Sequence, residues 1–352
     1  MKTYRDHYYP NTETLAAAEM RVTALGTGRP YLRRSQANAG WLIELGNGDK
    51  FMFDFGFGTQ MNFSALEIPY NAMTAYFATH LHTDHVGDFM QIRQGSWSGG
   101  RMHPLQVYGP SGPIPEYGMA HFVAHQCESF RWDEDSRQGF LPAVGAEVAC
   151  HEFDFSKTHV VYEKNDVTIT SFPAVHIYDG PVSLRLDWNG LSMVYSGDTT
   201  PSYFMVENAQ NVDLLIHETF DSVEVMIEKA GYDEASARGV CTVAHSDPVE
   251  AGKVFELCAP RLAVGYHFYN DHDTAPGCAS AVRTHYQGAL ALARDFMVFN
   301  VTAEKIVTRM AVTSAHTWPN KAFHDDGFKK AYRKERMKMS RWLAEKQIFP
   351  KF

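Results

Sequence analysis

A group of histidines and aspartates directly after a short apolar run constrains the chain more than any other feature. Residues 79–88 read Thr-His-Leu-His-Thr-Asp-His-Val-Gly-Asp, which places His80, His82, Asp84 and His85 in one short segment. The imidazoles of His80 and His82 point the same way in an extended backbone, while Asp84 and His85 follow on a tighter turn. Neutral imidazole and carboxylate are a ligand set that zinc accepts. The spacing therefore predicts two adjacent metal positions rather than a histidine-rich surface turn.

Other candidate ligands also follow strand-like runs. Residues 73–78 are apolar and aromatic and predict a buried strand with the histidines at its carboxyl end, where open α/β sheets carry their chemistry. The corresponding residues later in the chain are His176 after 167–172, Asp198 after 193–196, His217 and Glu218 after 212–216, and His267 after 262–265. The repetition indicates a second layered half with the same polarity.

Composition narrows the class of protein. With 352 residues, 45% of them hydrophobic, the chain can bury a large core, as one domain or two joined halves. The net charge of -9 argues against a dedicated polyanion binder. The start carries no signal-peptide pattern and no run is long enough to span a bilayer, so we expect no membrane segment and a cytoplasmic location. Five widely spaced cysteines favour a reduced, disulfide-free protein.

The expected organisation has three parts. Residues 1–19 are predicted to form an N-terminal arm, residues 20–325 the main domain, and residues 326–352 a basic amphipathic C-terminal helix. We expect this helix to dock on the body with its basic side in water, and an RNA-contacting face is the alternative. Two strands around residues 46–49 predict a hairpin. Asp54, at the end of that hairpin, either orients a ligand histidine or caps the following helix.

The motif His80-x-His82-x-Asp84-His85 resembles the hallmark of the metallo-β-lactamase superfamily, and the chain is most similar to the ribonuclease Z branch. The matching segments span residues 20 to about 270 in the family's order. They are Leu25-Gly26-Thr27-Gly28, Phe53-Asp54-x-Gly56-x-Gly58-Thr59, Thr79 to His85, Val107-Tyr108-Gly109-Pro110, Ser196-Gly197-Asp198-Thr199, His217-Glu218-Thr219-Phe220, Ala244-His245-Ser246 and His267-Phe268. The resemblance implies an α/β protein, an αββα sandwich of two similar halves with a di-zinc site at one edge.

The resemblance also implies a role for each site residue. His80, His82 and His176 would hold one Zn²⁺, Asp84, His85 and His267 the other, and Asp198 would bridge the two. Asp84 would in addition orient the attacking hydroxide, and His245, held by Glu218, matches the family's proton-donating pair.

Residues 112–165 depart from the ribonuclease Z pattern. Bacterial ribonuclease Z enzymes carry a glycine-rich basic arm that grips transfer RNA, whereas this stretch has few basic residues and includes Trp132-Asp133-Glu134-Asp135. We therefore expect this stretch to bind the phosphates of RNA only weakly. The chain is also similar to metagenome-derived third-subclass metallo-β-lactamases with ribonuclease Z-like sequence, although typical third-subclass enzymes lack the bridging aspartate.

We therefore expect a di-zinc hydrolase that opens β-lactam rings and confers antibiotic resistance, with ribonuclease Z-like endonuclease activity in tRNA 3′ processing. The expected partners are a β-lactam and tRNA, and the branch implies a homo-oligomer. Two alternatives stay open. One is a small-ester hydrolase of arylsulfatase or lactonase type on the same site, and the other is a dedicated RNA-processing factor that binds RNA through the C-terminal helix.

Overall fold

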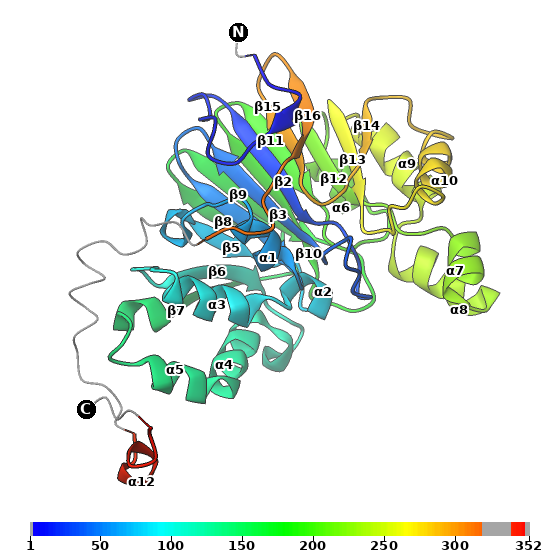
Figure 1. Cartoon of the computed structure of the whole chain (residues 1–352). Coiled ribbons are helices and arrows are strands. Elements are labelled where there is room, and N and C mark those ends of the chain that lie inside the picture. Colours follow the sequence, from blue (N-terminus) through cyan, green and yellow to red (C-terminus); the bar gives the residue numbers. More distant parts are fainter. Residues whose placement is uncertain (1–2, 319–338, 349–352) are drawn as a thin grey trace.

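Two β-sheets packed face to face, with helices on the outside, make up the fold (Figure 1). The computed structural model describes residues 3–318 and 339–348. Within these residues one sheet has nine strands in the order β1-β16-β15-β2-β3-β4-β5-β6-β7, and the other has seven in the order β14-β13-β12-β11-β10-β9-β8. Both sheets mix parallel and antiparallel pairs. The expected α/β sandwich of the metallo-β-lactamase type is confirmed.

The strands follow the apolar runs of the sequence. The larger sheet contains β1 (His7–Tyr8), β2 (Met20–Gly26), β3 (Gly40–Leu45), β4 (Lys50–Phe55), β5 (Ala75–Phe77), β6 (Leu105–Pro110), β7 (Val148–Phe153), β15 (Met297–Val301) and β16 (Ile306–Ala311). The smaller sheet contains β8 (His159–Lys164), β9 (Val167–Pro173), β10 (Val182–Trp188), β11 (Leu191–Tyr195), β12 (Leu214–Glu218), β13 (Leu262–Tyr266) and β14 (Leu290–Leu292). The predicted hairpin is confirmed, because β3 and β4 pair antiparallel.

Three apolar layers hold the sheets and helices together. Side chains alternate between the two faces of a strand, so Trp41 and Ile43 face the other sheet while Leu42 faces the outer helices. On the far side of the smaller sheet, Val194 and Leu215 pack against helix residues such as Val254. This core fixes the relative position of the two sheets, and with it the edge where their strands end.

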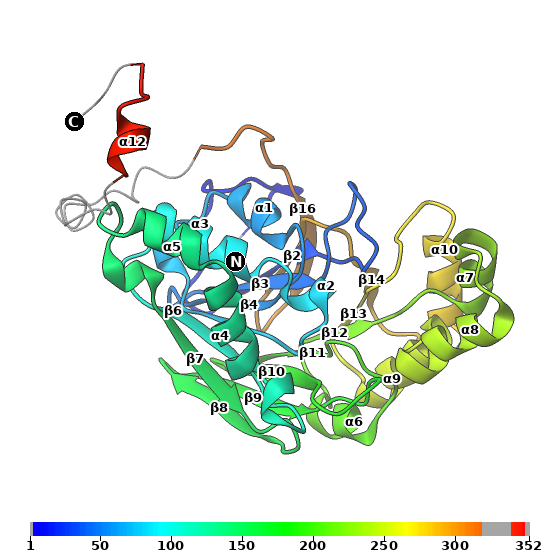
Figure 2. The same cartoon turned by 90° about the horizontal axis from the view of Figure 1, so that it is seen from below.

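The helices lie outside the sheets (Figure 2). They are α1 (Thr59–Ser64), α2 (Thr83–Val86), α3 (Phe89–Ser98), α4 (Met119–Ser129), α5 (Arg131–Arg137), α6 (Tyr203–Asn208), α7 (Val223–Ala230), α8 (Glu234–Arg238), α9 (Pro248–Cys258), α10 (Ala275–Val282) and α12 (Arg341–Ala344). Shorter helical turns are η1 (Tyr70–Ala72), η2 (Pro115–Tyr117), η3 (Ala143–Ala146) and the π-helical η4 (Gly239–Ala244).

Three segments outside the central strands bear on the predicted organisation of the chain. Residues 112–165 contain η2, α4, α5, η3, β7 and β8, and α4 packs against β6 and β7. Of the expected C-terminal helix, residues 326–338 and 349–352 lie outside the described residues, and the described part contains the short helix α12. In the N-terminal segment, β1 pairs in parallel with β16 and Tyr8 is buried.

Two expectations from composition concern the whole chain. All five cysteines are free thiols, as expected. Across the described parts of the chain, we find no helix whose length and apolar character would let it cross a membrane.

Candidate metal centre

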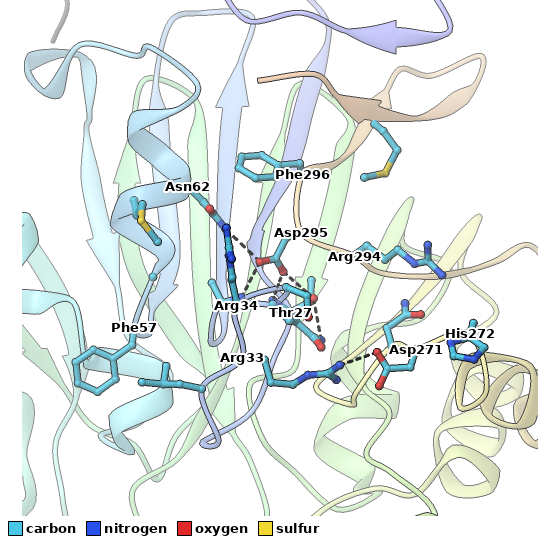
Figure 3. Close-up of a pocket in the computed structure, with 18 residues that line it drawn as sticks. Thr27, Arg33, Arg34, Phe57, Asn62, Asp271, His272, Arg294, Asp295 and Phe296 are labelled. Atoms are coloured by element: carbon cyan, nitrogen blue, oxygen red, sulfur yellow. Dashed lines mark hydrogen bonds and ion pairs between the residues drawn. The ribbon is translucent and has the colours of Figure 1, made fainter. Parts of the chain in front are cut away.

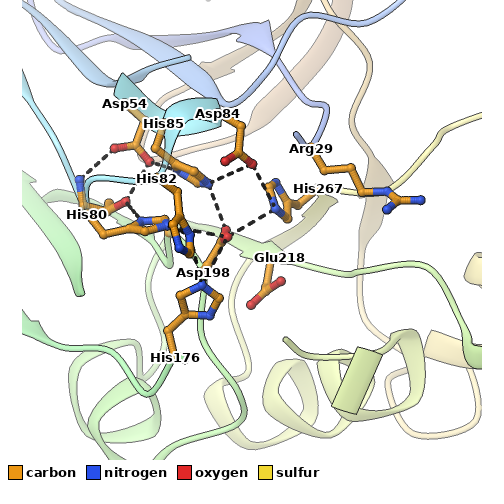
Figure 4. Close-up of polar contacts among 12 residues, drawn as sticks. Arg29, Asp54, His80, His82, Asp84, His85, His176, Asp198, Glu218 and His267 are labelled. Carbon is orange, nitrogen blue, oxygen red and sulfur yellow. Dashed lines mark hydrogen bonds and ion pairs between the residues drawn. The ribbon is translucent and has the colours of Figure 1, made fainter. Parts of the chain in front are cut away.

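The seven candidate ligands come together at the edge where strands of both sheets end (Figure 4). From the larger sheet, the loop after β5 and helix α2 supply four of them, and from the smaller sheet the segments after β9, β11 and β13 supply the other three. They are His80, His82, Asp84 and His85 from the first, and His176, Asp198 and His267 from the second. Residues far apart in the sequence therefore share one site because the sheets stack.

The ligand atoms fall into two overlapping groups. One contains His80, His82, His176 and Asp198, and the other contains Asp84, His85, Asp198 and His267, with the ligand atoms of each group within 4.8 Å of one another. Asp198 belongs to both groups. The arrangement is consistent with a metal site in which Asp198 is a shared carboxylate.

The donor atoms of this cluster fit a metal. Among the described residues, buried atoms without a hydrogen-bond partner include Asp84 Oδ2, His85 Nε2, Asp198 Oδ1 and both ring nitrogens of His267. Leaving a buried polar atom unpaired costs about 1–3 kcal/mol, so such atoms seldom gather without a ligand. Imidazole nitrogens with carboxylate oxygens are the donor set that zinc favours. The cluster is thus a metal site, and zinc suits its donors.

Residues behind the cluster orient its histidines. Asp54 accepts hydrogen bonds from the Thr79 backbone N–H (2.7 Å) and from the Tyr195 hydroxyl (2.8 Å), and its Oδ2 lies 2.6 Å from His85 Nδ1. A carboxylate on Nδ1 leaves Nε2 to face the cluster. Of the two interpretations left open by the sequence, Asp54 therefore has the orienting one, and the cap position of α1 is taken by Gly58.

His245 and Glu218 form a pair next to the cluster. His245 Nδ1 lies 2.8 Å from Glu218 Oε2, and Phe220 stacks on the His245 ring at a centroid distance of 4.2 Å. Burial lowers the pKa of His245, but the Glu218 carboxylate outweighs burial and raises it to about 8. The imidazole therefore carries a proton at neutral pH, which suits a proton donor.

Sequence reasoning missed Arg29. This buried residue lies beside His267 in Figure 4, forms an ion pair with Asp221 at 2.9 Å, and its guanidinium sits 4.0 Å from the centre of the Tyr269 ring. The signal in the sequence that could have pointed to Arg29 was its place as a charged residue in the glycine-rich turn of residues 26–30. Its partner Asp221 lies on a distant segment, so the pattern alone could not pair the two.

His121 and His125 lie outside the site. They lie on α4, where their rings stack on each other with centroids 3.9 Å apart.

Two stacked sheets with outer helices and a histidine and aspartate cluster at the strand ends define the metallo-β-lactamase fold. Solved structures agree. The metallo-β-lactamase fold protein YhfI from Bacillus subtilis has a TM-score of 0.60 and 18% identity over 81% of this chain and 100% of that chain. The short form of human tRNase Z has a TM-score of 0.59 and 20% identity over 79% of this chain and 98% of that chain.

The chain belongs to the β-lactamase superfamily domain family, whose model matches residues 53–268. Ribonuclease Z of Mycobacterium sp. strain KMS is 28% identical over 256 residues, which cover 71% of this chain and 84% of the relative. Ribonuclease Z of Methanothermobacter thermautotrophicus is 26% identical over 331 residues, 81% of this chain and 97% of the relative. The chain is thus a metallo-β-lactamase-fold metallo-hydrolase distantly related to ribonuclease Z. The expected β-lactam ring opening and antibiotic resistance gain no support from these similarities.

Proposed function

We propose that this chain is a zinc-dependent phosphodiesterase of the ribonuclease Z type. The observation that carries the proposal is the His245–Glu218 pair, with its 2.8 Å contact, beside the two ligand groups. Cleavage of a phosphodiester in RNA releases an alkoxide, which needs a proton as it departs. A histidine whose pKa is raised to about 8 meets that need at neutral pH.

Each residue of the site has a distinct task in this proposal. His80, His82 and His176 would hold one zinc ion, and Asp84, His85 and His267 a second, with Asp198 shared. When bound, zinc would lower the pKa of water towards neutrality and withdraw charge from the phosphoryl oxygens.

The remaining steps belong to the chain's own groups. Asp84 would accept a hydrogen bond from the attacking water and so aim it at phosphorus. Glu218 holds His245 through Nδ1, which leaves Nε2 of His245 to donate a proton to the departing oxygen.

The test compares three substrates on one zinc-loaded preparation and a chelated control. We expect chelator-sensitive hydrolysis of bis(p-nitrophenyl) phosphate and of a precursor tRNA, with no turnover of a chromogenic cephalosporin. Cephalosporin hydrolysis without phosphodiester cleavage would overturn the proposal in favour of the β-lactamase prediction, and hydrolysis of aryl sulfates or lactones alone would favour the small-ester prediction.

How this chain would hold tRNA is a separate point. Residues 112–165 contribute β7 to the larger sheet and β8 to the smaller one and have few basic residues, so binding to the phosphates would have to come from another segment. We propose the basic residues of 326–352 for this role. The test is the salt dependence of tRNA binding, in which the logarithm of the binding constant falls with the logarithm of the salt concentration. The steepness of this fall depends on the number of phosphate contacts, so a chain shortened at residue 325 should show a shallower slope than the full chain. The homo-oligomer expected for this branch can be measured by light scattering on the same samples.

A further inference from the structure

An apolar cavity of about 420 Å³ opens directly beside the first ligand group. Three histidines form its floor, namely His80, His82 and His176. Three large side chains at its rim are well exposed to solvent, Tyr117 by 54%, Tyr178 by 63% and Ile177 by 68%. Exposed apolar groups that gather around a site typically mark a contact with a ligand.

Tyr117 is fixed in place by its own segment. It ends the turn η2, where its backbone N–H donates to the carbonyl of Ile114 (3.0 Å). The turn rests on Gly112, at which a Cβ atom would lie 2.5 Å from Tyr117 Cβ. This close packing against Gly112 fixes the position from which the Tyr117 side chain extends.

Tyr178 comes from the loop that also carries His176. The Ala174 N–H donates to the Pro181 carbonyl (3.1 Å) and closes the base of this loop. The Thr200 N–H donates to the Val175 carbonyl (2.7 Å), and the His176 ring is held at Ala244 (2.6 Å). The loop is therefore anchored on both sides of the metal ligand, and Tyr178 follows two residues later.

The two tyrosine rings make an edge-to-face pair with centroids 6.0 Å apart and an angle of 76°. A planar group that stacks on one of these rings, in the angle between them, turns its own edge to the face of the other, and aromatic groups favour both geometries. The cavity wall also contains Glu116 and Asp179, and the described residues that line it include neither lysine nor arginine. Two carboxylates without a basic residue disfavour a chain of phosphates in this position.

We propose that Tyr117 and Tyr178 bind a planar aromatic group next to the scissile phosphate. The substrate class is then a phosphodiester that carries an aryl ring or a nucleobase directly beside the scissile phosphate. The inference rests on the proposed phosphodiesterase function, because that function places the phosphate at the ligand groups on the cavity floor.

The test measures binding rather than turnover. Calorimetric titration of the zinc-loaded protein with phenyl phosphate and with methyl phosphate compares ligands that differ in the aromatic ring. We expect wild type to bind phenyl phosphate about tenfold more tightly, since stacking a planar group on an aromatic side chain is worth at least about that factor. Tyr178→Ala should reduce the preference to about twofold or less, and Tyr178→Phe should retain it because the ring remains.

Two further variants make the result specific. Tyr117→Ala should act like Tyr178→Ala, whereas Tyr9→Ala, which also removes a partly exposed tyrosine but lies outside the cavity, should leave the preference unchanged. Equal affinity of wild type for the two ligands, or a preference that survives in the double variant of Tyr117 and Tyr178, would overturn the proposal.

The two proposals fail in different ways. Hydrolysis of bis(p-nitrophenyl) phosphate without an aromatic preference leaves the phosphodiesterase standing and removes the tyrosine site. An aromatic preference without phosphodiester hydrolysis would keep the tyrosine site and overturn the phosphodiesterase proposal. If precursor tRNA is cleaved equally well by wild type and by Tyr178→Ala, and phenyl phosphate is not preferred, RNA is cleaved without the two tyrosines and the aromatic-site proposal is wrong.

Discussion

Asp198 is the side chain around which the histidines of the site gather. Its carboxylate oxygens lie between 3.2 and 3.9 Å from ring nitrogens of five histidines, which are His80, His85, His176, His245 and His267. Burial raises the pKa of this carboxyl, but His267 and His85 outweigh burial and hold it well below its usual range. The neighbouring histidines therefore favour the ionised carboxylate, the form that binds a metal.

Because Asp198 belongs to both ligand groups, its loss should weaken both metal positions. We predict that Asp198→Ala lowers the zinc content from two ions per chain to about one, as measured by elemental analysis after dialysis. Asp154→Ala, which removes a half-exposed aspartate that belongs to neither ligand group, is the matched control and should retain both ions. Unchanged zinc in Asp198→Ala would contradict the shared role.

His245 allows leaving-group chemistry to be separated from metal binding. We predict that His245→Ala keeps its zinc and loses about 100-fold in RNA cleavage, because the departing alkoxide no longer receives a proton. Hydrolysis of bis(p-nitrophenyl) phosphate should fall far less, since p-nitrophenolate leaves without protonation. Equal losses on the two substrates, in single-turnover rates, would show that His245 positions the substrate instead.

At the scale of elements, close backbone contact holds the short helix α2 against β4. A Cβ atom at Gly56 would lie 1.9 Å from the backbone oxygen of Asp84, which itself accepts a hydrogen bond from the Ala39 N–H (3.0 Å). The absence of a side chain at residue 56 thus permits the contact that places Asp84 and His85.

We predict that Gly56→Ala lowers the free energy of unfolding by about 2 kcal/mol and reduces zinc affinity, because the clash is with backbone that must move. Gly277→Ala is the control. That residue lies in α10, where an added Cβ meets nothing within 4 Å, so stability should be unchanged or slightly higher. Urea unfolding and zinc titration measure both variants, and equal behaviour of the two would refute the packing argument.

Asp295 ties the loop after β2 to helix α1, in the wall of a cavity of about 740 Å³ (Figure 3). Its carboxylate accepts hydrogen bonds from the Thr27 N–H (3.1 Å), the Ala37 N–H (2.7 Å) and the Asn62 amide (3.1 Å). Burial nevertheless raises the pKa of Asp295 from 3.8 to about 6. The folded chain therefore binds this proton more tightly than the unfolded chain does.

A pH dependence of stability follows, with a definite sign. The contribution of Asp295 is full below about pH 4 and is lost as the pH rises through 6. We predict that the unfolding free energy of metal-free wild type, minus that of Asp295→Asn, falls between pH 4 and pH 7 by up to about 3 kcal/mol. Urea unfolding of both proteins across this range measures the difference, and parallel pH profiles would contradict the assignment.

At the scale of the whole molecule, the metal site joins the two sheets. Four ligands come from the larger sheet and three from the smaller, so an ion bound to both stabilises the folded chain against the unfolded one.

We predict that a chelator lowers the melting temperature of the zinc-loaded protein by several degrees. Zinc at a hundredfold excess over its dissociation constant contributes about 2.7 kcal/mol to stability. Readdition of zinc should restore the transition, and Asp198→Ala should respond less than wild type. Identical melting curves with and without chelator would show that the ligand groups are formed independently of the ion.

The sequence by itself determined the class of fold, the type of chemistry and the ligands to expect. The spacing of residues 80–85 and the apolar runs before His176, Asp198 and His267 indicated metal ligands at strand ends. The resemblance to the metallo-β-lactamase superfamily supplied the sandwich fold and the full ligand set. The β-lactam prediction was a different kind of inference. It rested on resemblance to a subset of the superfamily, and the shared ligand pattern does not specify the substrate.

Only the tertiary structure decided which distant residues meet. That Asp54 orients His85, that Arg29 pairs with Asp221, and that Tyr117 and Tyr178 form one corner of a cavity all depend on how the two sheets stack. Within residues 112–165, α4 is half-exposed and its place is set by contact with β6 and β7, which a local pattern does not reveal. Local sequence encodes which way a side chain points from its own element, whereas the packing of the whole core determines what that side chain finds there.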